Sequence, residues 1–187
     1  MNRPTPSVLL VGLMGTGKST VARQLSAKLG IDCLDTDKMV EARSGRTVRE
    51  LFNELGENAF RDLESDVLNE CLSRQSASVV AGAGGIVVRE SNRALINDAR
   101  RRHAIVVVWL HATTEVLASR TAKGGHRPLL DDDRVGTLAR LAAERADYYS
   151  EVSDIVVDVS NRSVESTVAL LVSAIEEGLR EEGGNNE

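Results

Sequence analysis

The sequence predicts an α/β fold of three layers, in which a five-stranded parallel sheet carries helices on both faces. Short apolar runs of strand length alternate along the chain with segments whose apolar residues recur at helical spacing. The run 104–110 lacks polar alternation, as expected for a central strand that is covered on both sides. The strand runs are 8–11, 31–34, 78–81, 104–110 and 154–159.

A Gly-rich loop follows the first strand run and reads Gly-Leu-Met-Gly-Thr-Gly-Lys-Ser-Thr over residues 12–20. This is the pattern of a phosphate-binding loop, whose glycines let backbone N–H groups converge on phosphates at the start of a helix. We expect Lys18 to reach the β- and γ-phosphates and Ser19 to bind Mg²⁺. An ordinary Gly-rich turn is the structural alternative. The other residues expected at the phosphates are Gly15, Thr16, Gly17 and Thr20.

Start and stop signals mark the helices between the strands. The first helix follows the loop and ends at Gly30, a residue type that suits a helix C-terminus. Thr47 and Glu50 fit a capping box, and Gly56 ends that short helix. Helices over 134–149 and 164–179 are also expected, and residues 181–187 are expected to form a disordered tail. The helix after Gly56 has the apolar face Phe60, Leu63, Val67, Leu68 and Cys71.

Two carboxylates, Asp35 and Asp37, follow the second strand run. If this segment stays extended, both project to the same side, and their place beside a triphosphate implies a cation, Mg²⁺. The alternative is an N-cap for a helix beginning near Lys38, which suits one Asp better than both. Since ligands of an open parallel sheet lie beyond the carboxyl ends of its strands, we expect both carboxylates beside the phosphate loop.

The ends of the third and fourth strand runs lie at the same predicted edge. The third run is followed by Gly82-Ala83-Gly84-Gly85, a turn whose backbone could approach a ligand closely. The fourth run is followed by His111, which we interpret as a solvated loop residue.

Arg61 stands in the first turns of a helix, where the helix dipole disfavours a cation. A ligand could explain that position. From spacing alone, however, Arg61 and Glu64 are more simply a surface ion pair at i,i+3.

The stretch 121–133 is polar, bears glycines and has no helical period, which is typical of a mobile lid. Its Arg127 could close over a transferring phosphoryl group and exclude water. From the sequence alone, Arg120 and Arg145 are interpreted as solvated helix residues.

The whole chain, 1–187, is predicted to form a single domain with its core over about 8–179. Its net charge of −5 and its scattered arginines favour neither nucleic acid nor a membrane as a partner. The start of the chain contains no run long enough for a secretory signal, which favours a cytoplasmic protein, and few apolar surface runs favour a monomer. In that compartment Cys33 and Cys71 are expected to be small buried hydrophobes.

Together these motifs resemble the shikimate kinases, small P-loop kinases similar in architecture to the nucleoside monophosphate kinases. The resemblance spans about residues 8–179. Besides the phosphate loop, the Asp35-Thr36-Asp37 triplet and the Gly-rich turn, it rests on three blocks. These blocks are Gly56-Glu57 to Phe60-Arg61 to Glu64, Arg127-Pro128-Leu129-Leu130, and Arg145-Ala146-Asp147-Tyr148-Tyr149.

The resemblance implies an enzyme that transfers the γ-phosphoryl group of ATP to the 3-hydroxyl of shikimate, a step of aromatic amino-acid biosynthesis. Lys18 and Ser19 would hold the ATP phosphates and Mg²⁺, and Asp35 would reach the metal through water. The remaining nucleotide contacts implied are Arg127 at the phosphoryl group in transfer, Arg120 against adenine, and Arg162.

The acceptor pocket is implied in the same way, beside the helical region 38–73. Asp37 would bind the acceptor hydroxyl and act as its base. Arg61, oriented by Glu64, would clamp the shikimate carboxylate together with Arg145, a role that suits the guanidinium fork. The turn residues Gly84 and Gly85 would present backbone N–H groups.

The turn departs from the Gly-Gly-Gly of the family, because Ala83 stands at its first position. If that position needs a positive φ, alanine costs about 1–2 kcal/mol there; otherwise little changes. Because the turn borders the acceptor, other small acceptors remain as alternatives: gluconate, a cyclitol or a nucleoside monophosphate. An alternative of another class is a catalytically weak ATP-binding regulatory module.

Overall fold

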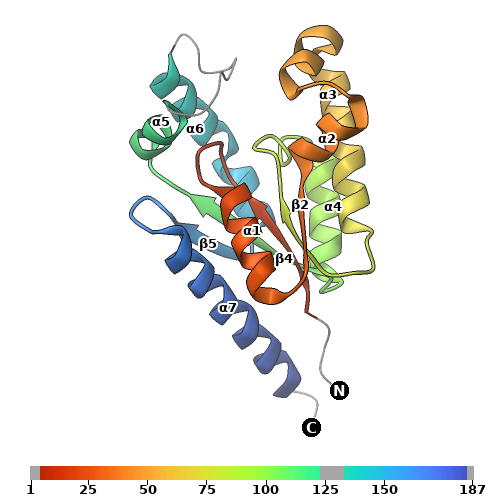
Figure 1. Cartoon of the computed structure of the whole chain (residues 1–187), viewed down its shortest axis with the longest axis vertical. Coiled ribbons are helices and arrows are strands. Elements are labelled where there is room, and N and C mark those ends of the chain that lie inside the picture. Colours follow the sequence, from red (N-terminus) through yellow and green to blue (C-terminus); the bar gives the residue numbers. More distant parts are fainter. Residues whose placement is uncertain (1–4, 123–132, 185–187) are drawn as a thin grey trace.

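The computed structural model describes residues 5–122 and 133–184, with the side chains of the last helix described through residue 177. Its centre is a five-stranded parallel sheet in the order β2-β3-β1-β4-β5 (Figure 1). The predicted α/β class and the parallel sheet are therefore confirmed. The strands are β1 Ser7–Val11, β2 Asp32–Asp35, β3 Ser78–Ala81, β4 Ile105–His111 and β5 Ile155–Asp158.

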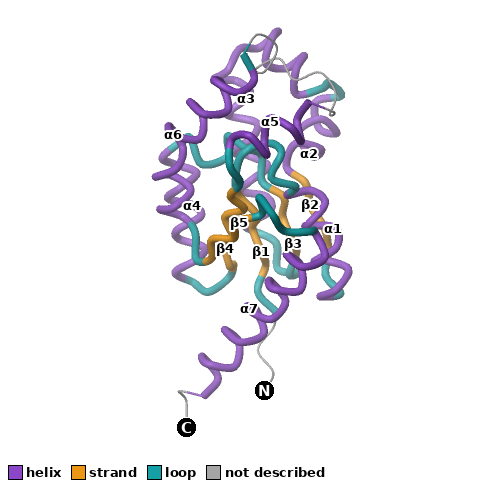
Figure 2. Tube along the Cα trace, turned by 90° about the vertical axis from the view of Figure 1, so that its left-hand side faces the viewer, coloured by secondary structure: helices purple, strands orange, loops and turns teal. Residues whose placement is uncertain are grey.

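Helices cover both faces of this sheet, as predicted. Figure 2 shows α1 and α7 on one side of the strands and α4 and α6 on the other. α2 packs against α3 above the end of the sheet at which the phosphate loop lies, and the second part of α3 runs down beside α4 (Figure 1). The helices are α1 Lys18–Leu29, α2 Thr36–Ser44, α3 Val48–Leu72, α4 Glu90–Arg101, α5 Thr114–Ala122, α6 Arg134–Val152 and α7 Val164–Gly184.

The core lies around the central strands. β1 pairs with β3 on one side and β4 on the other, and its Leu9 and Leu10 have no exposed surface. The continuous apolar runs follow from this double coverage, since neither face of these strands meets water. The edge strand β2 differs, because it pairs with β3 alone. There Cys33 is exposed, so its predicted burial was wrong, whereas Cys71 is buried.

Local signals account for most helix boundaries. Thr47 and Glu50 form the predicted capping box at the start of α3. Gly56, with φ 77° and ψ 170°, interrupts α3 where the sequence indicated a helix end. α7 continues to Gly184, so residues 181–184 are helical and not part of a tail. Leu, Arg and Glu at 179–182 favour that extension.

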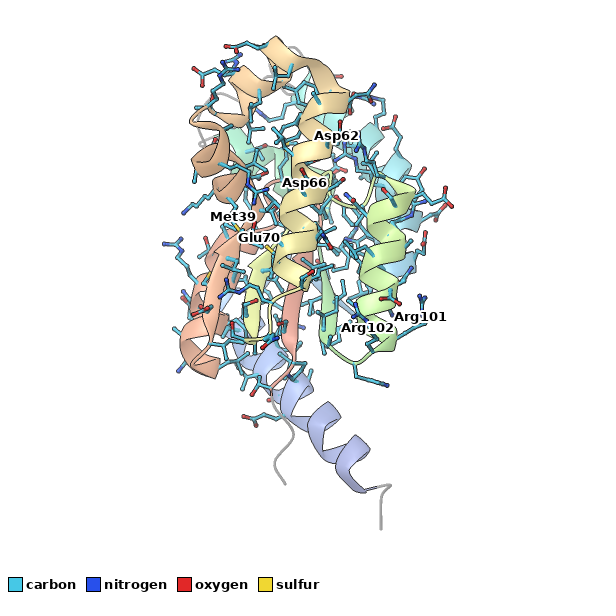
Figure 3. The ribbon with its side chains drawn as sticks, turned by 90° about the vertical axis from the view of Figure 1, so that its right-hand side faces the viewer. Met39, Asp62, Asp66, Glu70, Arg101 and Arg102 are labelled. Carbon is cyan, nitrogen blue, oxygen red and sulfur yellow. The ribbon has the colours of Figure 1, made fainter. Side chains whose placement is uncertain are left out.

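The second half of α3 has two different sides. Asp62, Asp66 and Glu70 form a row along its outer side (Figure 3), because residues four apart share one side of a helix. Asp62 pairs with Arg89, and Glu70 pairs with Arg43 of α2. The inner side carries the buried residues Phe60, Arg61, Glu64, Val67, Leu68 and Cys71.

The expected lid remains largely outside this description. The predicted lid, 121–133, falls largely on residues 123–132, which lie outside the described residues together with Arg127. No helix in the described part of the chain is both long and apolar enough to span a bilayer.

Candidate active site

The phosphate loop occupies the turn between β1 and α1. Gly12, Gly15 and Gly17 have φ values of 136°, 87° and 89°, a region in which side chains are strained. At Gly12 space is lacking as well, since a Cβ there would lie 2.3 Å from the Leu110 carbonyl oxygen. Gly17 is the N-cap of α1 without a side-chain cap, so the first N–H groups of the helix face the loop.

Lys18 bends back over this loop. Its Nζ donates to the carbonyl oxygens of Gly12, at 2.8 Å, and Leu13, at 2.9 Å. The Thr16 hydroxyl also donates to Leu13, at 2.8 Å, and its side chain is buried. The loop is thus braced internally, with an ammonium group at the N-terminus of a helix, an arrangement suited to anions.

Asp35 meets the phosphate loop from the end of β2. The Ser19 hydroxyl donates to Asp35 Oδ2 at 2.7 Å, which places two hard oxygen donors together. Mg²⁺ prefers such donors and commonly takes few protein ligands, so this pair fits the ion. Asp35 is also the N-cap of α2, accepting from the Lys38 N–H at 3.4 Å. Asp35 therefore caps α2, which was the alternative interpretation, and at the same time accepts a hydrogen bond from Ser19.

Asp37 lies in the first turn of α2 and is exposed. The segment 35–37 does not stay extended, so the predicted reason for the two carboxylates sharing a side was wrong. A helix starting at Thr36 instead turns Asp37 away from the line of the strand. Among the residues described, no three or more His, Cys, Asp or Glu side chains cluster as metal ligands.

Arg61 and Glu64 form a buried ion pair, which corrects the interpretation as a surface pair. Arg61 is 8 % exposed and Glu64 is 1 % exposed. Glu57 Oε1 lies 3.3 Å from Arg61 Nη2 at the rim. Spacing along the helix identified the pair, but only packing against other elements buries it.

The Arg61 guanidinium lies directly over the Gly-rich turn. A Cβ at Gly85 would stand 1.9 Å from Arg61 Nη1, so only glycine fits beneath the guanidinium as it is placed. Arg61 Nε is buried and has no hydrogen-bond partner. A buried guanidinium N–H without an acceptor is costly.

Charges on three elements converge around Glu64. Burial raises the pKa of Glu64, and the negative charge of Asp37 raises this pKa further. The positive charges of Arg61 and Arg145 act in the opposite direction and lower the pKa. Asp37, Arg61 and Arg145 are therefore close enough to Glu64 to affect its ionisation. The structure brings together the residues expected to bind the acceptor.

Arg145 is held against the same turn, and it is 9 % exposed, not solvated. Its Nη1 donates to the Gly84 carbonyl at 2.9 Å, and the Tyr149 hydroxyl donates to the same oxygen at 2.6 Å. Burial raises the pKa of Tyr149 to about 12, which keeps the phenol protonated as a donor at neutral pH. Sequence reasoning missed Tyr149, although its position four residues after Arg145 was the available signal.

Ala83 fits the turn without strain. Of the non-glycine residues described, only His103 has a positive φ, so Ala83 does not need the conformation that would penalise its side chain. Its N–H donates to the buried Thr36 Oγ1 at 2.8 Å. The turn is thereby tied to the residue between the two carboxylates.

Arg120 lies beyond the other side of the phosphate loop, at the end of α5. It is exposed, as the sequence indicated, and its Nη2 donates to the Val159 carbonyl at 2.8 Å. Arg162 is exposed shortly after Val159, before α7. His111 is exposed too, in an edge-on contact with the Trp109 ring.

The strand order and the loop after the central strand define a P-loop kinase, with a cluster of buried charged side chains beside the phosphate loop. The family model described as "Shikimate kinase" matches residues 14–176. The chain therefore belongs to the shikimate kinase family.

Relatives of known structure and sequence agree with this assignment. A shikimate kinase from Symbiobacterium thermophilum is 38% identical over 174 residues, covering 91% of this chain and 97% of the relative. A shikimate kinase from Acinetobacter baumannii, solved in complex with shikimate, superposes with a TM-score of 0.86 at 32% identity, covering 92% and 94% of the two chains. A Sinorhizobium meliloti gluconokinase, at 19% identity and TM-score 0.64 over 99% of this chain and 100% of its own, shares the fold.

Proposed function

We infer that this chain transfers the γ-phosphoryl group of ATP to the 3-hydroxyl of shikimate, giving shikimate 3-phosphate and ADP. One observation carries the choice of acceptor: two buried guanidinium groups are anchored on adjacent residues of one turn. Arg61 lies over Gly85, and Arg145 bonds the carbonyl of Gly84. Two planar forks at one place suit a carboxylate, which accepts paired N–H bonds.

The same cluster favours an acid over a nucleotide as the acceptor. A nucleotide base is held by stacking or by hydrogen bonds to its edge, and the chain is only 3% aromatic. The two buried guanidinium groups, by contrast, favour an acceptor that carries an anionic oxygen atom. The carboxylate of shikimate would supply that atom, with backbone N–H groups at Gly84 and Gly85 beside it.

ATP would occupy the phosphate loop. Its β- and γ-phosphates would replace the neutral carbonyl partners of Lys18 with charged oxygens, and charge-assisted hydrogen bonds are the stronger kind. Gly15, Thr16, Gly17 and Thr20 would contribute loop and helix N-terminal contacts.

Mg²⁺ would be bound at Ser19, with Asp35 reaching it through water, and would neutralise charge on the phosphates. Support for this comes from the contact between the Ser19 hydroxyl and the Asp35 carboxylate. Arg127 would stabilise the phosphoryl group in transfer. At the opposite end of the nucleotide Arg120 would lie against adenine, and Arg162 would be a further ATP contact.

Asp37 would bind the 3-hydroxyl of shikimate and accept its proton as the phosphoryl group arrives. Because the transition state of phosphoryl transfer is loose, little is demanded of the attacking oxygen. The main contribution of Asp37 is then to orient the hydroxyl in line with the γ-phosphate. Glu64, which forms a buried ion pair with Arg61, would orient that arginine.

A steady-state assay of ADP release with Mg-ATP tests the acceptor, comparing shikimate with quinate, gluconate and CMP. We expect saturable turnover with shikimate alone and loss of turnover when EDTA removes Mg²⁺. Arg61→Lys keeps the charge but loses the fork, so it should raise the KM for shikimate at least about 10-fold. Arg102→Lys, at the exposed end of α4 (Figure 3), is the matched control. Turnover with another acceptor alone would refute the proposal.

We also propose that the chain acts as a monomer in the cytoplasm. The large hydrophobic side chains exposed among the described residues, Leu55, Val135 and Val156, lie on three different elements. Both cysteines are free, which fits a reducing compartment. A dimer mass in light scattering, or recovery outside the cytoplasmic fraction, would contradict this.

A further inference from the structure

The carbonyl oxygen of Gly84 accepts two hydrogen bonds from the same helix. Arg145 Nη1 lies 2.9 Å from it and the Tyr149 hydroxyl lies 2.6 Å from it. The two donors are four residues apart on α6 and therefore share one side of that helix. A carbonyl oxygen has two lone pairs, so this pair of donors uses its full capacity.

Packing fixes the Tyr149 hydroxyl more firmly than the guanidinium. The Tyr149 side chain is 1 % exposed, and its ring stacks on Trp109 of β4 with centroids 5.6 Å apart. An arginine side chain has several more rotatable bonds, and part of the Arg145 guanidinium must serve the acceptor. Tyr149 is therefore the fixed donor to the Gly84 carbonyl oxygen, and Arg145 is a second donor to that same oxygen.

Holding this oxygen also sets the direction of a neighbouring N–H. The Gly84 carbonyl and the Gly85 N–H belong to one planar peptide, which is trans because the described chain contains no cis peptide bond. In a trans peptide these two groups point in opposite directions. The Gly85 N–H thus points away from Tyr149 and Arg145. Gly85 is also the residue over which the Arg61 guanidinium lies.

We propose that Tyr149 is a positioning residue for the acceptor. By bonding the Gly84 carbonyl it orients the Gly84–Gly85 peptide and the Arg145 guanidinium, so that one arrangement of N–H groups meets the acceptor carboxylate. The role rests on the proposed shikimate kinase function. Tyr149 acts through Gly84 and Arg145 and needs no contact with shikimate itself.

Tyr149→Phe removes the hydroxyl and keeps the ring that stacks on Trp109. Losing one buried hydrogen bond should raise the KM for shikimate roughly 5- to 30-fold, while the KM for ATP stays within about 2-fold. Tyr148→Phe is the matched control, because Tyr148 is the adjacent residue and its ring instead lies under Arg93. A KM for shikimate that does not change in Tyr149→Phe, or an equal rise for both substrates, overturns the role.

A double-mutant cycle separates positioning from general stability. In an Arg145→Lys background the guanidinium that Tyr149 orients is already absent and only the Gly84–Gly85 peptide remains for Tyr149 to hold, so Tyr149→Phe should raise the KM for shikimate by a smaller factor than it does in the wild type. An equal fold-change in both backgrounds would mean that Tyr149 acts independently of Arg145, and would overturn the proposal.

A second measurement does not require Tyr149→Phe to fold. The chain contains only two tyrosines, so Tyr148→Phe grown with 3-fluorotyrosine carries a single ¹⁹F label at Tyr149. Shikimate added without nucleotide should shift this resonance, because the bound carboxylate changes the guanidinium that shares the Gly84 oxygen. No shift at a shikimate concentration that saturates a thermal-shift assay overturns the role.

The same experiments distinguish the two proposals. Wild-type chain that does not turn over shikimate overturns the proposed function and this role with it. Normal wild-type turnover with unchanged constants in Tyr149→Phe overturns the role of Tyr149 alone.

Discussion

Asp37 is the residue on which we propose that catalysis by this chain depends most directly. Asp37→Asn keeps the shape of the side chain but replaces the carboxylate with a neutral amide, which holds the acceptor hydroxyl in line less firmly and cannot accept its proton, so we expect kcat to fall about 100-fold or more. The KM for ATP should change less than about 2-fold, since the phosphate loop is untouched. Asp62→Asn, on the outer side of α3, controls for a lost carboxylate. Near-normal kcat in Asp37→Asn would refute its role.

The two thiols should differ sharply in reactivity. Cys33 is exposed, whereas burial raises the pKa of Cys71 to about 11. The thiolate is the reactive form, and at pH 8 only about one in a thousand Cys71 side chains would carry it. Ellman's reagent should therefore titrate one thiol in the native chain and two after unfolding. Cys33→Ser should abolish the native reaction, and a rapid reaction of that variant would contradict the assignment.

Residue types and spacing predict the phosphate loop well, because its chemistry is contained in one continuous segment. They predict the acceptor pocket poorly. The spacing of Arg61 and Glu64 identifies a pair, but its burial depends on the turn after β3 and on α6, which are distant in the sequence. For Tyr149 the only local signal is its spacing of four residues from Arg145, and that spacing does not reveal its partner, the backbone carbonyl of Gly84.

At the scale of elements, Thr36 joins α2 to the Gly-rich turn. Its Oγ1 accepts from the N–H of Ala83, and Thr36 itself has no exposed surface. Thr36→Val keeps the shape but leaves that N–H unsatisfied, so it should destabilise the fold by about 1–3 kcal/mol. Thr36→Ser retains the acceptor and should cost less. Urea unfolding of both variants is the measurement, and a loss of stability in Thr36→Ser as large as that in Thr36→Val would show that the methyl group matters as much as the hydrogen bond.

The helix boundaries were predicted where a cap marks them and missed where context decides. Thr47, Glu50 and Gly56 act through their immediate neighbours, so the sequence alone located both features of α3. The N-cap alternative placed the start of α2 near Lys38, and the helix begins earlier, at Thr36, because Asp35 caps it instead of continuing the strand by further residues. That small shift changes where the Asp37 carboxylate points.

At the scale of the whole molecule, the periodicity predicts five parallel strands but not their order. β3 lies between β1 and β2, and this insertion brings the turn after β3 next to both the phosphate loop and Asp35. A Cβ at Gly84 would lie 3.5 Å from the Met14 nitrogen, which measures how closely the two loops approach. The site therefore depends on a strand order that no local pattern encodes.

The central strands should accordingly carry far more of the stability than the edges. Leu9 is fully buried on β1 between Val80 and Val107. Leu9→Ala should lower the free energy of unfolding by about 2–5 kcal/mol, because apolar burial is lost and a cavity is left. For a chain of this length that lowers Tm by roughly 5–15 °C. Val156 is 59% exposed on the edge strand β5, so Val156→Ala should change the free energy of unfolding by less than about 0.5 kcal/mol. Calorimetry of both variants checks the contrast; similar Tm losses would mean that the edge of the sheet is covered in solution, which would also contradict the proposed monomer.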